Sequence, residues 1–327
     1  MKTLTFFNNK GGVGKTSLVY HLAWMFAELD LEVLVADLDP QANLTSMFLQ
    51  DSQVLELWEK QRSRETVFGA VEDLLRGLGD VKAVPTIDVS TKISLIPGDL
   101  GLSRFEDSLS ESWSKSFGGD ERSFRVLTAF HRLLATAAEK KKADLVLLDV
   151  GPNLGAINRT ALLTSDMVVF PVAPDLFSLQ GLRNLGPTLS KWRSDWTTIR
   201  SNAPPDISVP AGEMRPLGYV LLQHGVFSKR VVKAYANWAD KIPEAYSKYI
   251  FPQDADTYSL ETDQECLAKL KHYRSLMPMA MEARKPIFLL KTADGAIGAH
   301  LYAVKECYQD FKALAEKIIT KAGINNS

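Results

Sequence analysis

Residues 4–17 read LTFFNNKGGVGKTS, and the fold is decided in this stretch. The apolar run at 4–7 predicts a short buried strand, and apolar residues at helical spacing over 16–29 predict a helix. A glycine-rich loop at 8–15 joins the two. A second apolar run, at 33–36, completes a strand–loop–helix–strand unit with the size of one parallel crossover.

The loop between strand and helix predicts a site for nucleotide phosphates. Backbone N–H groups in such a glycine-rich turn point at anions, and the helix N-terminus favours negative charge. Lys15 would reach the β- and γ-phosphates, and the Thr16 hydroxyl would bind Mg²⁺. The standard motif has glycine where this chain has Asn9, and a second lysine, Lys10, opens the loop instead. An incidental glycine-rich turn is the alternative, but the strand before and the helix after favour the phosphate site. The residues assigned to phosphate binding are Gly11, Gly12, Val13, Gly14, Lys15, Thr16 and Ser17.

Acidic residues follow two of the apolar runs directly. Asp37 and Asp39 come after the second predicted strand, and Asp149 ends the apolar run Leu145–Leu148. The carboxyl ends of strands face the crevice where nucleotides bind in open parallel sheets. Carboxylate oxygens there bind Mg²⁺, often through water. An ordinary turn is the alternative for each segment, and the preceding phosphate loop favours the metal site.

Several of these segments together resemble one known family. Residues 10–17, KGGVGKTS, resemble the deviant Walker A motif of the ParA/MinD group of P-loop ATPases. Residues 37–43, DLDPQAN, resemble the ParA switch I segment, and 145–149 resemble a Walker B strand. The family usually continues with x-Pro-Pro, whereas this chain has Gly151 before Pro152. Further matches lie at 96–100, Asn158, Asp166, 171–174 and 177–182, so the resemblance covers about residues 1–50 and 93–190.

The resemblance implies ATP and Mg²⁺ as cofactors and slow hydrolysis of ATP to ADP and phosphate. In that family the early lysine reaches the partner's phosphates in an ATP-sandwich dimer, which implies that Lys10 acts in trans. A second cation at the γ-phosphate stabilises the charge of its oxygens, as an arginine finger does. The catalytic assignments are Lys10, Lys15 and Asp39, and the Mg²⁺ assignments are Thr16, Asp39 and Asp149. The switch residues are Asp37, Pro40, Gln41, Gly151 and Pro152, and Gln223 and Pro286 are proposed contacts of the base.

Apolar runs and helical patterns alternate along the whole chain. This predicts an α/β fold, a doubly wound and mostly parallel sheet with helices on both faces. A single P-loop ATPase domain over 1–327 is expected, with less regular insertions at about 51–92 and 195–216. The further strands are predicted at Ile93–Ile96, Met167–Val172, Leu217–Leu222 and Pro286–Leu290. The further helices are predicted at Phe124–Lys142, Lys229–Tyr249, Glu261–Leu276 and Ala299–Ala322.

Composition limits the remaining choices. With 38 Lys+Arg against 39 Asp+Glu, the net charge of -1 excludes a polybasic protein that binds nucleic acid through total charge, although local patches remain open. Two cysteines, Cys266 and Cys307, cannot form a disulfide framework or an all-cysteine metal site. No apolar run approaches the ~18 residues that a membrane-spanning helix needs. A signal peptide is not evident either, so we expect a cytoplasmic, nucleoid-associated protein.

The resemblance to ParA also implies partners. A homodimer in the ATP state would bind non-specific DNA, and a ParB-like or other adaptor would stimulate hydrolysis while plasmid, chromosome or other cargo is positioned. Lys229, Arg230 and Lys233 are the candidate DNA contacts, with Lys241 and Lys248 nearby. A solvated helix face is the alternative for this charge run. Because the phosphate loop begins near residue 8, we expect no N-terminal helix-turn-helix domain.

Two other functional classes remain open. A MinD-like membrane-positioning ATPase needs a C-terminal amphipathic helix, but the tail lacks aromatic residues after Phe311, and no membrane is expected. A metabolic ATP-dependent enzyme of the same superfamily is the third class. Its reductase form needs cluster cysteines near the switches, and Cys266 and Cys307 lie far from both in sequence. Its amide-ligase form needs a glutamine amidotransferase, for which no nucleophile is apparent.

Overall fold

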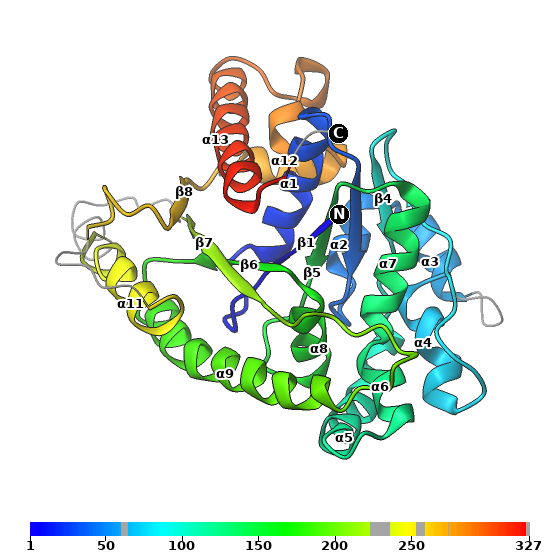
Figure 1. The fold of residues 1–327 in the computed structure, drawn as a ribbon. Helices are drawn as coiled ribbons and strands as arrows, with labels where there is room; N and C mark the ends of the chain where they lie inside the picture. The colour runs from blue at the N-terminus through cyan, green and yellow to red at the C-terminus, as the bar shows by residue number, and fades with distance from the viewer. Residues whose placement is uncertain (60–64, 223–235, 253–258, 274, 325–327) are drawn as a thin grey trace.

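The computed structural model describes residues 1–59, 65–222, 236–252, 259–273 and 275–324. Across these residues an eight-stranded sheet has the strand order β3-β4-β2-β5-β1-β6-β7-β8 (Figure 1). All neighbouring strands pair in parallel except β3, which is antiparallel to β4. The strands are β1 (Lys2–Phe6), β2 (Val33–Asp37), β3 (Ile87–Asp88), β4 (Ile93–Ile96), β5 (Leu145–Asp149), β6 (Met167–Val172), β7 (Arg215–Leu222) and β8 (Cys266–Leu270).

Helices cover both faces of the sheet, which confirms the predicted doubly wound fold (Figure 1). One face carries α1 (Lys15–Glu28), α2 (Asn43–Phe48), α3 (Asp51–Glu59), α12 (Leu276–Ala283) and α13 (Ala299–Ala322). The other carries α4 (Val67–Arg76), α5 (Glu106–Ser116), α6 (Glu121–Leu127), α7 (Ala129–Lys141), α8 (Ala156–Thr164), α9 (Leu176–Ser201) and α11 (Ile242–Tyr249). Short 3₁₀ turns lie at η1 (Leu100–Phe105), η2 (Ile287–Leu289) and η3 (Thr292–Asp294).

The two cores alternate along each central strand. In β5, Leu145 and Leu147 pack toward α1 and α13, whereas Val146 and Leu148 pack toward α7 and α8. All residues of β2, β5 and β6 are buried. Strands buried on both faces are continuous apolar runs rather than alternating ones, and this is why the sequence shows them clearly.

The structure corrects two predicted elements near the C-terminus. Glu261–Leu276 is not a helix, because β8 occupies Cys266–Leu270 and pairs in parallel with β7. Pro286–Leu290 is not a strand but the 3₁₀ turn η2, since the Pro286 carbonyl accepts the Leu289 N–H at 2.9 Å. The backbone N–H and C=O groups at the edge of β7 pair with those of β8. The local helical spacing of 261–276 does not reveal this distant partner.

Other predicted bounds shift by less. The helix expected at 124–142 is two helices, α6 and α7, which meet at Thr128. Helices α3 and α4 lie within 51–92, and α9 continues to Ser201, so the less regular part of 195–216 is 202–214. Residues 229–235 of the helix predicted to end at Tyr249 lie outside the described residues.

Candidate functional site

The phosphate loop lies at the carboxyl edge of the sheet, where β1 turns into α1 (Figure 1). Gly12 and Gly14 have φ of 70° and 84°, a backbone conformation that favours glycine. Gly14 is the N-cap of α1 and supplies no side-chain cap. The first N–H groups of α1 therefore have no side-chain acceptor at the cap, which is the arrangement that binds an anion.

Lys15 lies over this loop and is 7% exposed. Its Nζ donates to the backbone carbonyls of Asn8 and Lys10, at 3.0 and 3.3 Å. Burial lowers the pKa of Lys15, while the carboxylates of Asp149 and Asp39 oppose that shift. The ammonium is thus held at the loop by weak neutral acceptors that phosphate oxygens can replace.

The loop is anchored to its surroundings through Asn8. The Asn8 Nδ2 donates to the Pro171 carbonyl at the end of β6, at 2.7 Å. Its Oδ1 accepts the Lys10 N–H at 2.9 Å. A Cβ at Gly181 of α9 would lie 2.9 Å from the Asn9 Oδ1, so glycine there permits α9 to approach the loop closely.

Two carboxylates meet at the ends of β2 and β5. Asp37 and Asp149 are paired in register on these neighbouring strands. Asp37 Oδ2 accepts the N–H and the hydroxyl of Thr45, at 2.8 and 2.7 Å. Burial raises the pKa of Asp37 to about 7, with a further contribution from the Asp39 carboxylate. Thr45 Oγ1 in turn accepts the Gly98 N–H at 2.8 Å, which connects α2 to the turn after β4.

Asp149 is completely buried, and neither of its carboxylate oxygens has a hydrogen-bond partner among the described residues. Burial raises its pKa well above the usual range, and the Asp37 carboxylate adds to this, while the Thr16 side chain and the Lys15 ammonium oppose the shift. An unpartnered buried carboxylate is unfavourable unless a cation is supplied. Thr16, Asp39 and Asp149 therefore fit Mg²⁺, which prefers hard oxygen ligands.

The protein alone would not complete such a metal shell. No group of three or more His, Cys, Asp or Glu in the described part of the chain is arranged to hold a metal ion. Mg²⁺ usually keeps several waters and binds through one or two carboxylates together with substrate phosphates. The residues at this site match that partial set.

The residues predicted to form the switches lie against both the acidic pair and the loop. Asp39 Oδ1 accepts the Gln41 N–H at 3.0 Å, which shapes the turn after Pro40. A Cβ at Gly151 would lie 3.4 Å from the same Asp39 oxygen. Pro152 packs beside Gly11, and its Cγ would lie 3.9 Å from a Cβ added at Gly11.

The loop after Asp149 is held by Asn158 of α8. The Asn158 Nδ2 donates to the carbonyls of Gly151 and Asn153, at 2.9 and 2.8 Å. Asn158 is predicted only from the family resemblance, and in the structure it holds the loop that contains Gly151 and Pro152.

Lys10 is bound within its own chain. Its Nζ forms an ion pair with Asp175 Oδ2 and lies 5.9 Å from the centroid of the Phe177 ring. Asp175 also caps α9, because its Oδ1 accepts the Ser178 N–H at 2.8 Å. The sequence interpretation did not single out Asp175; an acidic N-cap three residues before a serine was the available signal.

Two cavities adjoin the phosphate loop. The larger, of about 690 Å³, lies between the loop, the segment that follows β2, and α12, and includes Asp39 and Pro152. The smaller, of about 160 Å³, lies between the first turn of α1 and the ends of β7 and β8, where Leu222, Leu270 and Tyr273 line it. Pro286 lines neither cavity, although its neighbour Ile287 lines the smaller one. Gln223 lies outside the described residues.

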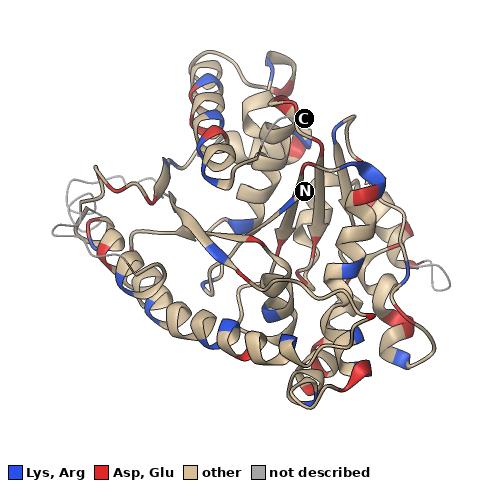
Figure 2. Cartoon of the chain, in the orientation of Figure 1, with Lys and Arg blue, Asp and Glu red and all other residues tan. Residues whose placement is uncertain are grey.

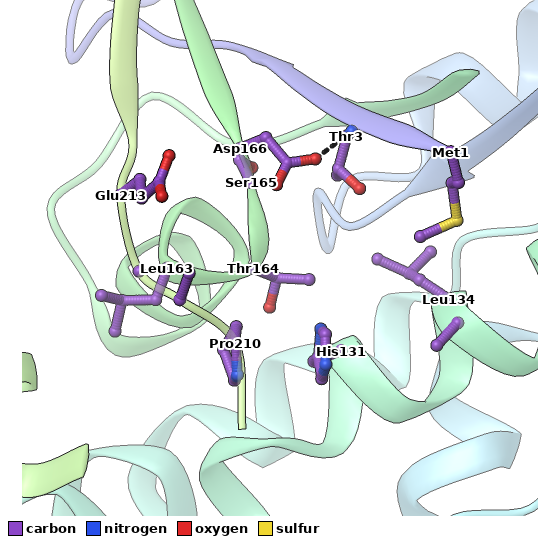
Figure 3. A pocket seen from close by; sticks show the side chains of 13 residues that line it. Met1, Thr3, His131, Leu134, Leu163, Thr164, Ser165, Asp166, Pro210 and Glu213 are labelled. Atoms are coloured by element: carbon purple, nitrogen blue, oxygen red, sulfur yellow. Dashed lines mark hydrogen bonds between the residues drawn. The ribbon is translucent and has the colours of Figure 1, made fainter. Parts of the chain in front are cut away.

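A further cavity, of about 130 Å³, lies at the opposite edge of the sheet (Figure 3). The Asp166 carboxylate accepts the Thr3 N–H there at 2.7 Å and ties the start of β6 to β1. His131 lines the same cavity, and burial lowers the pKa of its imidazole. This edge holds the amino ends of the strands, so Asp166 is separated from the phosphate loop. Its contact with Thr3 helps to hold β6 against β1.

Cations lie along the outer helices of the sheet, on α9 and α11 (Figure 2). Arg183 and Lys248 lie 5.8 and 5.6 Å from the centroid of the Tyr249 ring. Lys241 lies 4.9 Å from the Trp238 ring centroid. The predicted contacts Lys229, Arg230 and Lys233 lie outside the described residues. Among the described helices, none has both the length and the apolar character required to cross a membrane.

Comparison with known proteins gives matches in the part of the chain that contains the phosphate loop. The family model described as an AAA domain (AAA_31) matches residues 1–200. The chromosome partitioning protein ParA of Caulobacter vibrioides is 30% identical over 198 residues, which cover 59% of this chain and 64% of that protein. The chain spans 47–64% of the length of several curated relatives that it matches.

Two solved structures share the fold over nearly the whole chain. Protein DIP2308 from Corynebacterium diphtheriae has a TM-score of 0.68 at 25% identity, covering 98% of this chain and 99% of that one. A putative plasmid partition protein from Borrelia burgdorferi B31, bound to AMPPNP, has a TM-score of 0.59 at 19% identity, with coverage of 98% and 99%.

Proposed function

The chain belongs to the AAA-domain family of ParA-like P-loop ATPases, and on this premise we propose that it is an ATP-driven switch that positions cargo. ATP and Mg²⁺ would bind at the phosphate loop, and slow hydrolysis would return the protein to its resting state. The observation that carries this proposal is the meeting, at one edge of the sheet, of Lys15 and Asp149, whose carboxylate has no hydrogen-bond donor among the described residues.

Each residue of the site has a separate task. Lys15 and the N–H groups of the α1 N-terminus bind the phosphates, and Thr16 and Asp149 hold the metal. Bound Mg²⁺ neutralises charge that develops on the phosphate oxygens. Asp39 orients the attacking water, since its carboxylate is fixed by the Gln41 N–H and is only 8% exposed. The Asp37–Thr45 hydrogen bonds connect this centre to α2.

The ATP state would be a homodimer in which Lys10 reaches the partner's phosphates. Large apolar side chains are exposed beside Lys10 and in the loop after Asp149: Leu154 is 38% exposed, Leu176 53% and Phe177 72%. An exposed apolar group next to a charged site suits burial against a second copy. In this state Lys10 would stabilise the charge of the γ-phosphate.

Light scattering with ATP, ADP and a non-hydrolysable ATP analogue tests the switch. The wild type should dimerise with ATP or the analogue and remain monomeric with ADP. Lys15→Ala should lose nucleotide binding and turnover, whereas Lys10→Ala should bind nucleotide as a monomer but dimerise weakly. Unchanged turnover in Lys15→Ala would refute the assignment of the loop.

The dimer would bind non-specific DNA through cations on α9 and α11, and a ParB-like or other adaptor would stimulate its release. Arg183 of α9 and Lys248 of α11 support this, because both lie near the Tyr249 ring, and Lys241 lies near Trp238 just before α11. A dimer doubles the number of phosphates that the protein neutralises, which makes binding steeply dependent on salt. Plasmid, chromosome or another assembly is the cargo in this proposal, and the cytoplasm, on the nucleoid, is its location.

Retention on non-specific duplex DNA across a salt series tests this surface. The double variant Arg183→Ala/Lys248→Ala should weaken ATP-dependent retention and reduce the slope of log affinity against log salt by roughly 0.9 for each phosphate that the variant no longer neutralises. Lys191→Ala is the matched control, because Lys191 lies on α9 but is paired with Asp195. Equal retention with ATP and ADP would contradict the proposal.

A further inference from the structure

Lys10 and Asp175 are 165 positions apart in sequence, and the fold brings their charges together. Their side chains remain 29% and 35% exposed, so the pair lies at the mouth of the site rather than in the core. We propose that Asp175 is a positioning residue that holds Lys10 within its own chain and must release it before Lys10 reaches a second copy. This inference rests on the proposed function, in which Lys10 acts in trans.

The contact is built from fixed parts on both sides. The Asp175 backbone N–H donates to the Ala173 carbonyl at 2.9 Å, and its Oδ1 is occupied by the Ser178 N–H. Its Oδ2 accepts from the lysine. On the other side, the Lys10 N–H is fixed by Asn8 at 2.9 Å. Little freedom is lost when the two side chains pair, because both backbones are already held.

The same turn carries the surface that a second copy would cover. Leu176 and Phe177 follow Asp175 directly and are 53% and 72% exposed. The Lys10 ammonium also lies over the Phe177 ring. Docking of a partner on this turn would bury Phe177 and bring the partner's phosphates to the lysine that Asp175 holds.

The Lys10–Asp175 ion pair is the latch of this proposal. It makes dimerisation selective for the triphosphate. Lys10 exchanges one carboxylate for the partner's phosphate oxygens, and the exchange is favourable only if those oxygens carry more charge. ATP supplies the γ-phosphate charge that ADP lacks. The latch therefore opposes dimers of the ADP state and raises the ATP concentration needed for dimers.

The size of the effect follows from exposure. Partly exposed ion pairs change an equilibrium constant by about 1.4- to 5-fold. A symmetric dimer opens two latches, so loss of both should strengthen dimerisation by about 2- to 25-fold. Asparagine and serine are good N-caps, so Asp175→Asn and Asp175→Ser remove the charge and keep the cap of α9.

Dimer dissociation constants, measured by sedimentation with the non-hydrolysable analogue and with ADP, test the latch. Asp175→Asn and Asp175→Ser should both dimerise more tightly than the wild type and should begin to dimerise with ADP. Asp175→Glu, which keeps the charge, should remain closer to the wild type. In a Lys10→Ala background, Asp175→Asn should change nothing.

A double-mutant cycle of Lys10→Ala and Asp175→Asn on denaturant unfolding, without nucleotide, measures the ion pair in the monomer. A coupling of about 1.4- to 5-fold in the unfolding constant is expected, and zero coupling would overturn the latch. If the wild type dimerises and Asp175→Asn dimerises no more tightly, the latch alone is wrong. If neither protein dimerises with ATP, the dimeric switch is wrong and the release step with it.

Discussion

Replacement of Asp149 by asparagine should make the metal-free protein more stable and at the same time weaken its stabilisation by Mg²⁺ with ATP. The Asp149 carboxylate is fully buried, has no hydrogen-bond partner among the described residues, and lies in register with Asp37. Burial raises its pKa, and Asp37 adds to the shift, so the ionised form is disfavoured where it lies. The neutral amide of asparagine keeps the shape and removes the repulsion between the two carboxylates.

The magnitude follows from the charge, since raising the pKa of a carboxyl by about one costs about 1.4 kcal/mol at neutral pH. Asparagine removes that cost, although its own amide is buried at the same position. In a chain of 327 residues, 1 kcal/mol corresponds to about 1.5 °C in Tm. Mg²⁺ with ATP should stabilise the wild type by about 2.7 kcal/mol at 100 times the dissociation constant. The variant should therefore be the more stable protein without ligand, and the wild type should gain more stability when Mg²⁺ and ATP are added.

Thermal unfolding at fixed pH, with and without Mg²⁺ and ATP, measures both effects. Asp166→Asn is the control, because its carboxylate already accepts the Thr3 N–H at the opposite edge of the sheet. This control should keep the full response to ligand. A ligand-free Asp149→Asn protein that is less stable than the wild type would refute the reasoning, as would a normal response to Mg²⁺ and ATP.

Three other predictions concern separate parts of the chain. Asp39→Ala should trap the ATP dimer and reduce turnover, and fast residual phosphate release would contradict its role with the water. Burial lowers the pKa of His21 to about 4. The free energy of unfolding should therefore fall by about 3 kcal/mol as pH falls from 6.5 toward 4, because the unfolded chain binds a proton there that the folded chain does not. His21→Gln should flatten the free energy of unfolding across that window. Gly186→Ala places a Cβ 1.8 Å from the Tyr249 carbonyl and should cost roughly 1–3 kcal/mol in a denaturant titration. The control Gly118→Ala has its nearest neighbour at 3.5 Å and should cost far less.

Residue identity at short range predicted most of the phosphate site. The loop at 8–15 and the strand-end carboxylates Asp37 and Asp149 are readable because the motif lies between a buried strand and a helix. Their meeting at one edge also follows, since parallel strands present their carboxyl ends together. The order of the strands and the in-register pairing of β2 with β5 required the structure.

Local sequence pattern predicted the wrong secondary structure for two segments whose conformation depends on a partner distant in sequence. Cys266–Leu270 becomes β8 because the edge of β7 offers unpaired backbone groups, and the helical spacing of 261–276 contains no information about that edge. Pro286–Leu290 turns away as η2, anchored by the Ile287 N–H on His21 of α1 at 3.1 Å. Both segments are short, and for short apolar runs tertiary pairing overrides intrinsic preference.

The sequence by itself determined the chemistry: a loop that binds phosphates, two cations beside it, and acidic residues at strand ends. These depend on residue types a few positions apart, and so they are visible in the chain. The tertiary structure alone decided which charges meet, because Lys10 and Asp175 are joined only when α9 packs against the loop. It also left Asp149 without a partner among the described residues, since burial and the placement of donors are properties of packing rather than of sequence.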